Sequence, residues 1–139
     1  MKIIKVKSGS PYEDIESYSR VVTVGEWVMV SNTAGVDYAT QVFPKDAAGQ
    51  TRQALRNIRG ALEAVGSGLE DIVRSRVTIP NLDDAQSVMR EIGDALRGID
   101  PASTVTCSPL GGPQYLVEIE VTAYRGAGAE TQNRMTIAL

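Results

Sequence analysis

Charged side chains at alternating positions of two predicted strands are the first candidates for chemistry. Glu118 and Glu120 fall on one face of a strand near the C-terminus, and Arg74 and Arg76 fall on one face of an earlier strand. A carboxylate that faces a water-poor crevice has a raised pKa and can orient or deprotonate a water molecule. The same groups can instead pair as salt bridges. Glu118 therefore has a catalytic and a structural interpretation, and for the other three we favour charge pairing.

The residue types that are missing narrow the chemistry. The chain has no histidine and a single cysteine, Cys107, which excludes Ser-His and Cys-His pairs and removes the commonest metal ligand. Cys107 has no CxxC neighbour and no base partner, so we expect it to be a buried, small apolar residue. Gly111 and Gly112 lack the Lys-Ser/Thr and the helix start of a phosphate-binding loop. We expect no metal and no cofactor.

Length and charge set the class of protein. The 139 residues are 42% hydrophobic and 22% charged, which suits one globular domain. The net charge of −3 and the pI near 5.0 argue against a nucleic-acid partner. No signal peptide and no apolar run of about 18 residues is visible. We therefore expect a cytoplasmic protein with no membrane partner.

Two amphipathic helices are predicted from apolar residues at three- and four-residue spacing. The first stripe runs from Thr51 to Val65, with Asp46 as the N-cap and Gly66 at the C-terminal end. The second stripe runs from Ala85 to Leu96 and ends at Gly98, with Asp83 or Asp84 as the cap. Each helix has one apolar face to place against a sheet.

Alternating and β-branched residues predict six strands. Residues 32–35 are expected to leave the sheet, and Ser8–Pro11 is expected to form a turn. In the fourth strand we expect Val73, Ser75, Val77 and Ile79 on one face and Ile72, Arg74, Arg76 and Thr78 on the other. The predicted strands are residues 2–6, 18–24, 27–31, 71–79, 103–107 and 115–124.

The element order β-ββ-α-β-α-β-β predicts an α/β domain over residues 1–125, followed by a tail over residues 126–139. The two helices would cover one face of a six-stranded mixed sheet. The other face would carry the four charged residues named above together with Ile72 and Leu116. A half-apolar face with paired charges suggests an oligomer whose subunits cover it.

The order and spacing of several short stretches resemble the Rid family of reactive intermediate deaminases, also called the YjgF or endoribonuclease L-PSP type. The resemblance covers residues 8–125 and implies a chorismate-mutase-like fold. It also implies a homotrimer with a central barrel of strands and three ligand clefts between subunits. The matching stretches are Ser8–Glu13, Tyr18–Arg20, Val24–Ser31, Gln53–Ile58, Leu62–Gly66, Asp71–Arg74, Pro101-Ala102 and Val117–Glu120.

The resemblance also assigns the cleft residues. In deaminating members the cleft hydrolyses enamine and imine intermediates, and a tyrosine, a serine and a water-positioning glutamate line it. These positions fall on Tyr18, Ser31 and Glu118, and Asn32 stands where the family usually has glycine. Tyr18 can equally be an ordinary packed strand residue, and the Ser31 hydroxyl can equally satisfy backbone at the strand end.

One family position differs in this chain. The resemblance implies an arginine after the Pro-Ala pair that binds the substrate carboxylate, but this chain has Ser103 there, followed by Thr104. A hydroxyl gives a neutral hydrogen bond in place of a bidentate guanidinium grip, so a carboxylate would be held roughly 10-fold less tightly or worse. Both residues can also be ordinary strand residues. Arg74 or Arg76 is a second possible source of the missing positive charge.

Two functions fit these residues. The first is a homotrimeric enzyme, without a cofactor, for enamine or imine hydrolysis, elimination or tautomerisation on a small reactive metabolite, with water placed by Glu118. Because of Ser103, we do not expect a simple 2-iminopropionate deaminase. The second is a non-catalytic small-molecule-binding trimer, a sensor or chaperone-like protein. Some family members are named ribonucleases, but the acidic charge and the lack of an aromatic-basic stripe argue against RNA.

Overall fold

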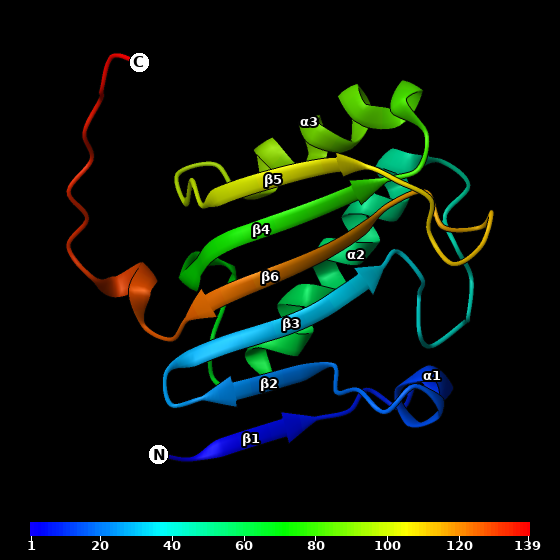
Figure 1. Cartoon of the computed structure of the whole chain (residues 1–139), viewed down its shortest axis with the longest axis horizontal. Helices are drawn as coiled ribbons and strands as arrows, with labels where there is room; N and C mark the ends of the chain where they lie inside the picture. The colour runs from blue at the N-terminus through cyan, green and yellow to red at the C-terminus, as the bar shows by residue number, and fades with distance from the viewer.

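One mixed sheet organises the chain, and the computed structural model describes all 139 residues (Figure 1). The strand order is β1-β2-β3-β6-β4-β5, with β4 and β5 parallel and every other neighbouring pair antiparallel. The elements are β1 (Ile3–Val6), α1 (Pro11–Ile15), β2 (Val21–Val24), β3 (Trp27–Ala34), α2 (Ala47–Glu63), β4 (Ile72–Ile79), α3 (Ala85–Ala95), β5 (Ala102–Cys107) and β6 (Glu118–Tyr124).

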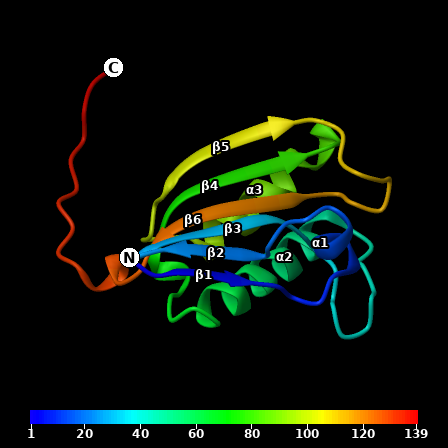
Figure 2. The same ribbon diagram turned by 60° about the horizontal axis from the view of Figure 1, so that its bottom comes forward.

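Helices α2 and α3 lie on the same face of the sheet and leave the other face open (Figure 2). The predicted six-stranded mixed sheet with two helices on one face is therefore confirmed. The prediction missed α1, which begins at Pro11, the last residue of the predicted turn Ser8–Pro11. Pro11 starts this helix, where its fixed φ suits the first turn and its missing N–H costs nothing.

The core lies between α2, α3 and the sheet. Ala54, Ile58 and Leu62 of the predicted α2 stripe are fully buried. The helix begins as expected, because the Asp46 carboxylate accepts a 2.6 Å hydrogen bond from the Gly49 N–H. Just beyond its C-terminal end, Gly66 adopts a φ of +73°.

A bulge at the start of β4 makes the facing prediction wrong for two residues. The register with β6 shifts between Ile72 and Arg74. Ile72 is therefore buried in the core at 3% exposure, whereas Val73 is 37% exposed beside Arg74. From Ser75 to Ile79 the alternation follows the prediction.

Strand β3 is longer than predicted and also contains an irregularity. It runs to Ala34, so residues 32–34 stay in the sheet, and its register with β6 shifts between Val30 and Thr33. The extra residue leaves Ser31 and Asn32 both outside the core while Thr33 is buried. Directly after β3, Gly35 lets α2 approach, because a Cβ there would lie 2.1 Å from the Gln50 carbonyl oxygen.

The chain beyond β6 has little regular structure. A short turn at Ala127–Ala129 packs near the start of β4, and the exposed residues 131–139 follow it (Figure 1). In this tail, Arg134 pairs with Asp100 and donates to the Gly98 carbonyl in the loop before β5. None of the helices is both long enough and apolar enough to cross a lipid bilayer.

Candidate functional site

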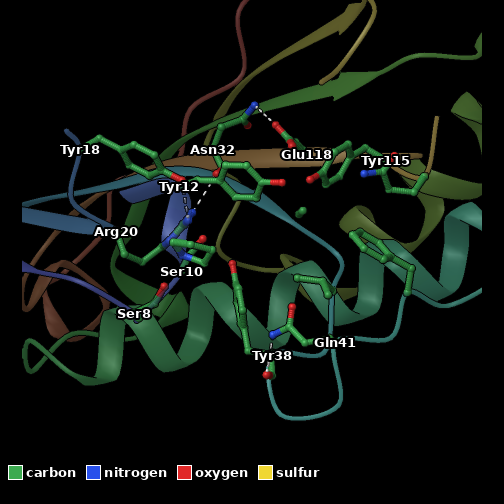
Figure 3. A pocket seen from close by; sticks show the side chains of 16 residues that line it. Ser8, Ser10, Tyr12, Tyr18, Arg20, Asn32, Tyr38, Gln41, Tyr115 and Glu118 are labelled. Atoms are coloured by element: carbon green, nitrogen blue, oxygen red, sulfur yellow. Dashed lines mark hydrogen bonds between the residues drawn. The ribbon is translucent and has the colours of Figure 1, made fainter. Parts of the chain in front are cut away.

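A cavity of about 410 Å³ opens at the end of the sheet where β6 begins (Figure 3). Its walls come from α1, the end of β3, the loop before α2 and the segment that leads into β6. The lining residues are Ser8, Gly9, Ser10, Pro11, Tyr12, Tyr18, Arg20, Asn32, Ala34, Val36, Tyr38, Gln41, Phe43, Gln114, Tyr115 and Glu118.

Four of the five tyrosines of the chain line this cavity. Tyr12 comes from α1, Tyr18 from the segment before β2, Tyr38 from the loop before α2, and Tyr115 from the segment before β6. The Tyr115 ring is fixed by an edge-to-face contact with Phe43, 5.4 Å between centroids. The site is therefore walled by aromatic rings that each carry a polar tip.

Glu118 is the acidic residue of the cavity. Its Oε2 atom accepts a 2.6 Å hydrogen bond from the Asn32 side-chain amide, and Oε1 has no partner in the chain. Burial raises the pKa of the Glu118 carboxyl, and the positive charge of Arg20 opposes that rise. The β3 irregularity matters here because it turns Asn32 toward this carboxylate.

Arg20 is the basic residue of the cavity, and it is already paired. Its Nε atom lies 3.2 Å from Oε2 of Glu13, and the two side chains are 8% and 0% exposed. Its Nη1 atom donates to the Asn32 carbonyl (2.9 Å) and to the Thr33 hydroxyl (3.2 Å). Ser8 donates two further hydrogen bonds to the Glu13 carboxylate, from its backbone N–H and from its hydroxyl. This network joins α1 to the β2–β3 hairpin and fixes one wall of the cavity.

Two buried amides hold the other walls in place. The Gln50 side chain, 2% exposed, donates to the carbonyls of Pro44 and Gln114 and accepts from the Leu116 N–H. Asn57 donates to the carbonyls of Ala34 and Val36. Helix α2 therefore fixes both loops that carry Tyr38 and Tyr115.

The phenols of Tyr38 and Tyr115 are kept as neutral donors. Burial is the main cause that raises the pKa of both groups, and nearby negative charge, including that of Glu118, adds to it. A neutral phenol can donate a hydrogen bond to a nitrogen or oxygen atom of a bound molecule. The cavity thus combines one carboxylate that can accept a proton with phenols that can donate hydrogen bonds.

The structure brings only part of the predicted site together. Tyr18, Asn32 and Glu118 line the cavity, and Ser31 lines an adjoining hollow of about 440 Å³. The Ser31 hydroxyl donates a 2.7 Å hydrogen bond to the Ser19 carbonyl, which is the backbone role considered for it.

Ser103 and Thr104 lie elsewhere. Both are on β5, which is separated from β6 by β4. The Ser103 hydroxyl lies 3.4 Å from that of Ser75, and the Thr104 hydroxyl accepts a 3.0 Å hydrogen bond from Arg74. Within one chain, neither residue lines the cavity of Glu118. Cys107, at the end of the same strand, is exposed, so the expectation that it is buried is wrong.

The remaining predicted charges occupy the open face of the sheet. Arg76 lies 3.4 Å from the Glu120 carboxylate, and both side chains are about half exposed. None of Arg74, Arg76 and Glu120 lines the cavity. No group of three or more His, Cys, Asp or Glu side chains is placed to hold a metal ion.

Sequence reasoning missed the buried Glu13–Arg20 pair and three of the cavity tyrosines. Arg20 lies within the predicted strand 18–24, and Glu13 follows the predicted turn Ser8–Pro11. Neither position indicates that its charge is buried. For the tyrosines, the available signal was their position in the sequence. Tyr12 follows the predicted turn and Tyr38 lies between predicted elements, where an amphipathic ring has no strand to pack into. Tyr115 is the first residue of a predicted strand.

Several solved protein structures are similar to this one. The structure superposes with a TM-score of 0.80 on a YjgF/YER057c/UK114-family protein of Mycobacterium tuberculosis, at 35% identity over 88% of this chain and 99% of that one. RidA of the Antarctic bacterium Psychrobacter sp. gives a TM-score of 0.75 at 27% identity, over 86% and 94% of the two chains. The fold is thus that of the YjgF structures.

Comparison of the sequence with known proteins points to the same family as the structural similarity. The family model described as Endoribonuclease L-PSP matches residues 10–125. The bovine 2-iminobutanoate/2-iminopropanoate deaminase is 31% identical over 116 residues, 81% of this chain and 82% of that one. An uncharacterized Streptomyces coelicolor protein is 30% identical over 124 residues, 88% and 92% of the two chains. The chain belongs to the Endoribonuclease L-PSP family, which is the Rid or YjgF family of the sequence resemblance.

Proposed function

We propose that this chain is an enzyme that hydrolyses the C=N bond of a small imine, or of its enamine tautomer, in the tyrosine-lined cavity. The observation that carries the proposal is Glu118, a partly buried carboxylate in the cavity wall that has one hydrogen bond, through Oε2, and a free Oε1 atom. The name of the bovine relative, an imine deaminase, supports the reaction class.

The chemistry needs few groups because an imine carbon is already electrophilic. A water molecule bound to Oε1 of Glu118 attacks the carbon of the protonated imine, and Glu118 accepts one proton from that water to give a neutral carbinolamine. Glu118 then returns this proton to the nitrogen, the C–N bond breaks, and the hydroxyl proton passes to the departing ammonia, which leaves a carbonyl group and an ammonium ion. Glu118 with a raised pKa can both take and return the proton. The phenols of Tyr38 and Tyr115 donate hydrogen bonds to the nitrogen or oxygen atoms where charge develops.

The test is hydrolysis of imines generated in solution from several amino acids and amines. We expect Glu118→Gln to lower the rate by about 100-fold or more, since general acid–base groups contribute effects of that size. Glu120→Gln is the matched control, because Glu120 lies on the same strand but pairs with Arg76 outside the cavity. Equal rates for the wild type and Glu118→Gln would remove Glu118 from the mechanism.

We also propose that three copies of the domain, residues 1–125, assemble through the open face of the sheet. The register places Trp27, Met29 and Tyr124 on that face together with the Arg76–Glu120 pair, and these aromatic and apolar side chains are exposed. Such packing would bring Ser103 and Thr104 of β5 to an intersubunit cleft. Light scattering should give three times the 14.9 kDa subunit mass; a species of one subunit mass would overturn the assembly.

A binding trimer without turnover is the second candidate. Ser103 favours it, because the arginine implied by the family resemblance is replaced and the cavity's own Arg20 is paired with Glu13. A ligand that raises the melting temperature and is recovered unchanged would select this candidate. The net charge of −3 and the absence of histidine favour a small metabolite over RNA for both candidates.

A further inference from the structure

The charged groups around the cavity leave no unpaired positive charge for a bound anion. Among the lining residues, only Arg20 has a basic side chain and only Glu118 has an acidic one. The Arg20 charge is matched by the fully buried Glu13, and both its Nε and Nη1 atoms already donate. Its Nη2 atom makes a long, 3.4 Å contact with the Tyr18 hydroxyl. The carboxylate of Glu118 is therefore the uncompensated charge at the site.

The aromatic rings point to the same ligand charge. Aromatic faces carry negative potential and attract ammonium and guanidinium groups. The close-up shows the Tyr12 and Tyr115 rings near the Glu118 carboxylate and the Tyr38 ring opposite them (Figure 3). Arg20 already uses one face of this kind, since its guanidinium carbon lies 5.6 Å from the centre of the Tyr18 ring. A wall of rings beside one free carboxylate is the arrangement that recognises organic cations.

We infer that the ligand of this cavity is a small organic cation, a protonated imine or amine without a carboxylate, held between the tyrosine rings and Glu118. The inference rests on the proposed function for its site and extends it to a substrate class. Within one chain, a carboxylate-bearing imino acid would meet the negative charge of Glu118 and no cation that lacks an acidic partner.

Three probes of nearly the same shape and different charge test the inference. These are choline, 3,3-dimethylbutan-1-ol and 3,3-dimethylbutanoate, each titrated against the full chain by ligand-observed NMR. We expect choline to bind at least about fivefold more tightly than the alcohol, and the butanoate to bind more weakly than either. Equal affinity for choline and the alcohol, tighter binding of the butanoate, or no binding of choline would each overturn the inference.

Paired variants locate the effect. Tyr12 is half exposed on α1, so its exchange leaves the core intact. Tyr12→Phe keeps the ring and should keep choline binding, whereas Tyr12→Leu should weaken it severalfold and leave alcohol binding unchanged. Glu118→Gln should weaken choline binding about 10-fold, with Glu120→Gln as the unchanged control. Equal effects of both tyrosine variants on choline and on the alcohol would contradict the role of the ring.

The binding result and the turnover result separate the two claims. Choline selectivity without hydrolysis of any imine supports the cation site and defeats the proposed enzyme. Hydrolysis that is fastest for carboxylate-bearing imines, with no preference for choline, supports the enzyme and defeats the cation site.

Discussion

Asp71 precedes β4 at one end of the sheet, and Glu118 begins β6 at the other. Asp71 is 5% exposed and accepts hydrogen bonds from the Ser67 hydroxyl (2.8 Å) and the Gly128 N–H (2.9 Å). Glu118 accepts one, from Asn32. Burial acts against the charged form of both. At Asp71 the hydrogen bonds outweigh burial and lower the pKa, whereas at Glu118 burial outweighs the charge of Arg20 and raises the pKa.

The two ends of the sheet therefore differ in how their carboxylates are bonded, and only the Glu118 end leaves an oxygen without a partner beside a cavity. Asp71 ties the Ala127–Ala129 turn to the sheet, and its oxygens are used by the fold itself. Glu118 keeps one oxygen free beside a cavity. Glu13 shows that the cavity end can also satisfy a carboxylate, because Ser8 and Arg20 surround it. Among these three carboxylates, only Glu118 has an oxygen atom without a hydrogen-bond partner.

The largest expected effect comes from breaking the buried pair at the cavity end. Arg20→Met leaves the Glu13 charge buried and unpaired, so the free energy of unfolding should fall by about 3–5 kcal/mol. Arg52→Met, which breaks the more exposed Arg52–Glu91 pair, is the matched control and should cost about 0–1 kcal/mol. Urea denaturation measures both.

A double variant sharpens this prediction. Glu13→Gln combined with Arg20→Met removes both charges and should recover part of the lost stability. If Arg20→Met were no more destabilising than Arg52→Met, the pair would not stabilise the cavity wall, and the contrast between Glu13 and Glu118 would lose its basis.

The next effect lies at the opposite end of the sheet. Asp71→Asn replaces a fully hydrogen-bonded carboxylate and should lower the free energy of unfolding by about 1–3 kcal/mol at neutral pH. Because the folded pKa is depressed, this stability is present above the ordinary value of 3.8 and is lost as the pH falls through the lower folded value. Between pH 7 and pH 2, the free energy of unfolding should therefore fall less for the variant than for the wild type, as measured by denaturation at each pH. If the variant lost as much stability in acid as the wild type, the structural role of Asp71 would be contradicted.

Local sequence signals were enough to predict most of the fold. Asp46, the apolar stripe after it and Gly66 define α2 because capping and periodicity act within a few residues. The two irregular strands were beyond such signals. Ile72 and Val73 are both apolar, so alternation cannot say which one is inserted; the pairing with β6 decides it.

The candidate site was predictable only where one residue carried its own signal. Glu118 was singled out by strand alternation, and the family resemblance added its role together with Tyr18 and Asn32. Tyr12, Tyr38 and Tyr115 come from three separate segments and meet only after the sheet and α2 have fixed the loops between them. The Glu13–Arg20 pair is local in sequence, but its burial depends on α1, a helix too short to show apolar periodicity.

The smallest effect has the opposite sign and concerns Glu118 itself. Its folded pKa is raised above the ordinary value of 4.5, so between these two values the folded state binds more protons than the unfolded state. The stability of the wild type should therefore decline as the pH rises through this window, and Glu118→Gln should not share the decline. Above the window the variant should be at least as stable as the wild type, in contrast to Asp71→Asn. Denaturation midpoints from pH 4 to 8, with Glu120→Gln as the control, measure this difference. A Glu118→Gln protein that loses stability at neutral pH as Asp71→Asn does would mean that Glu118 serves the fold, and that its free oxygen is not held for a ligand.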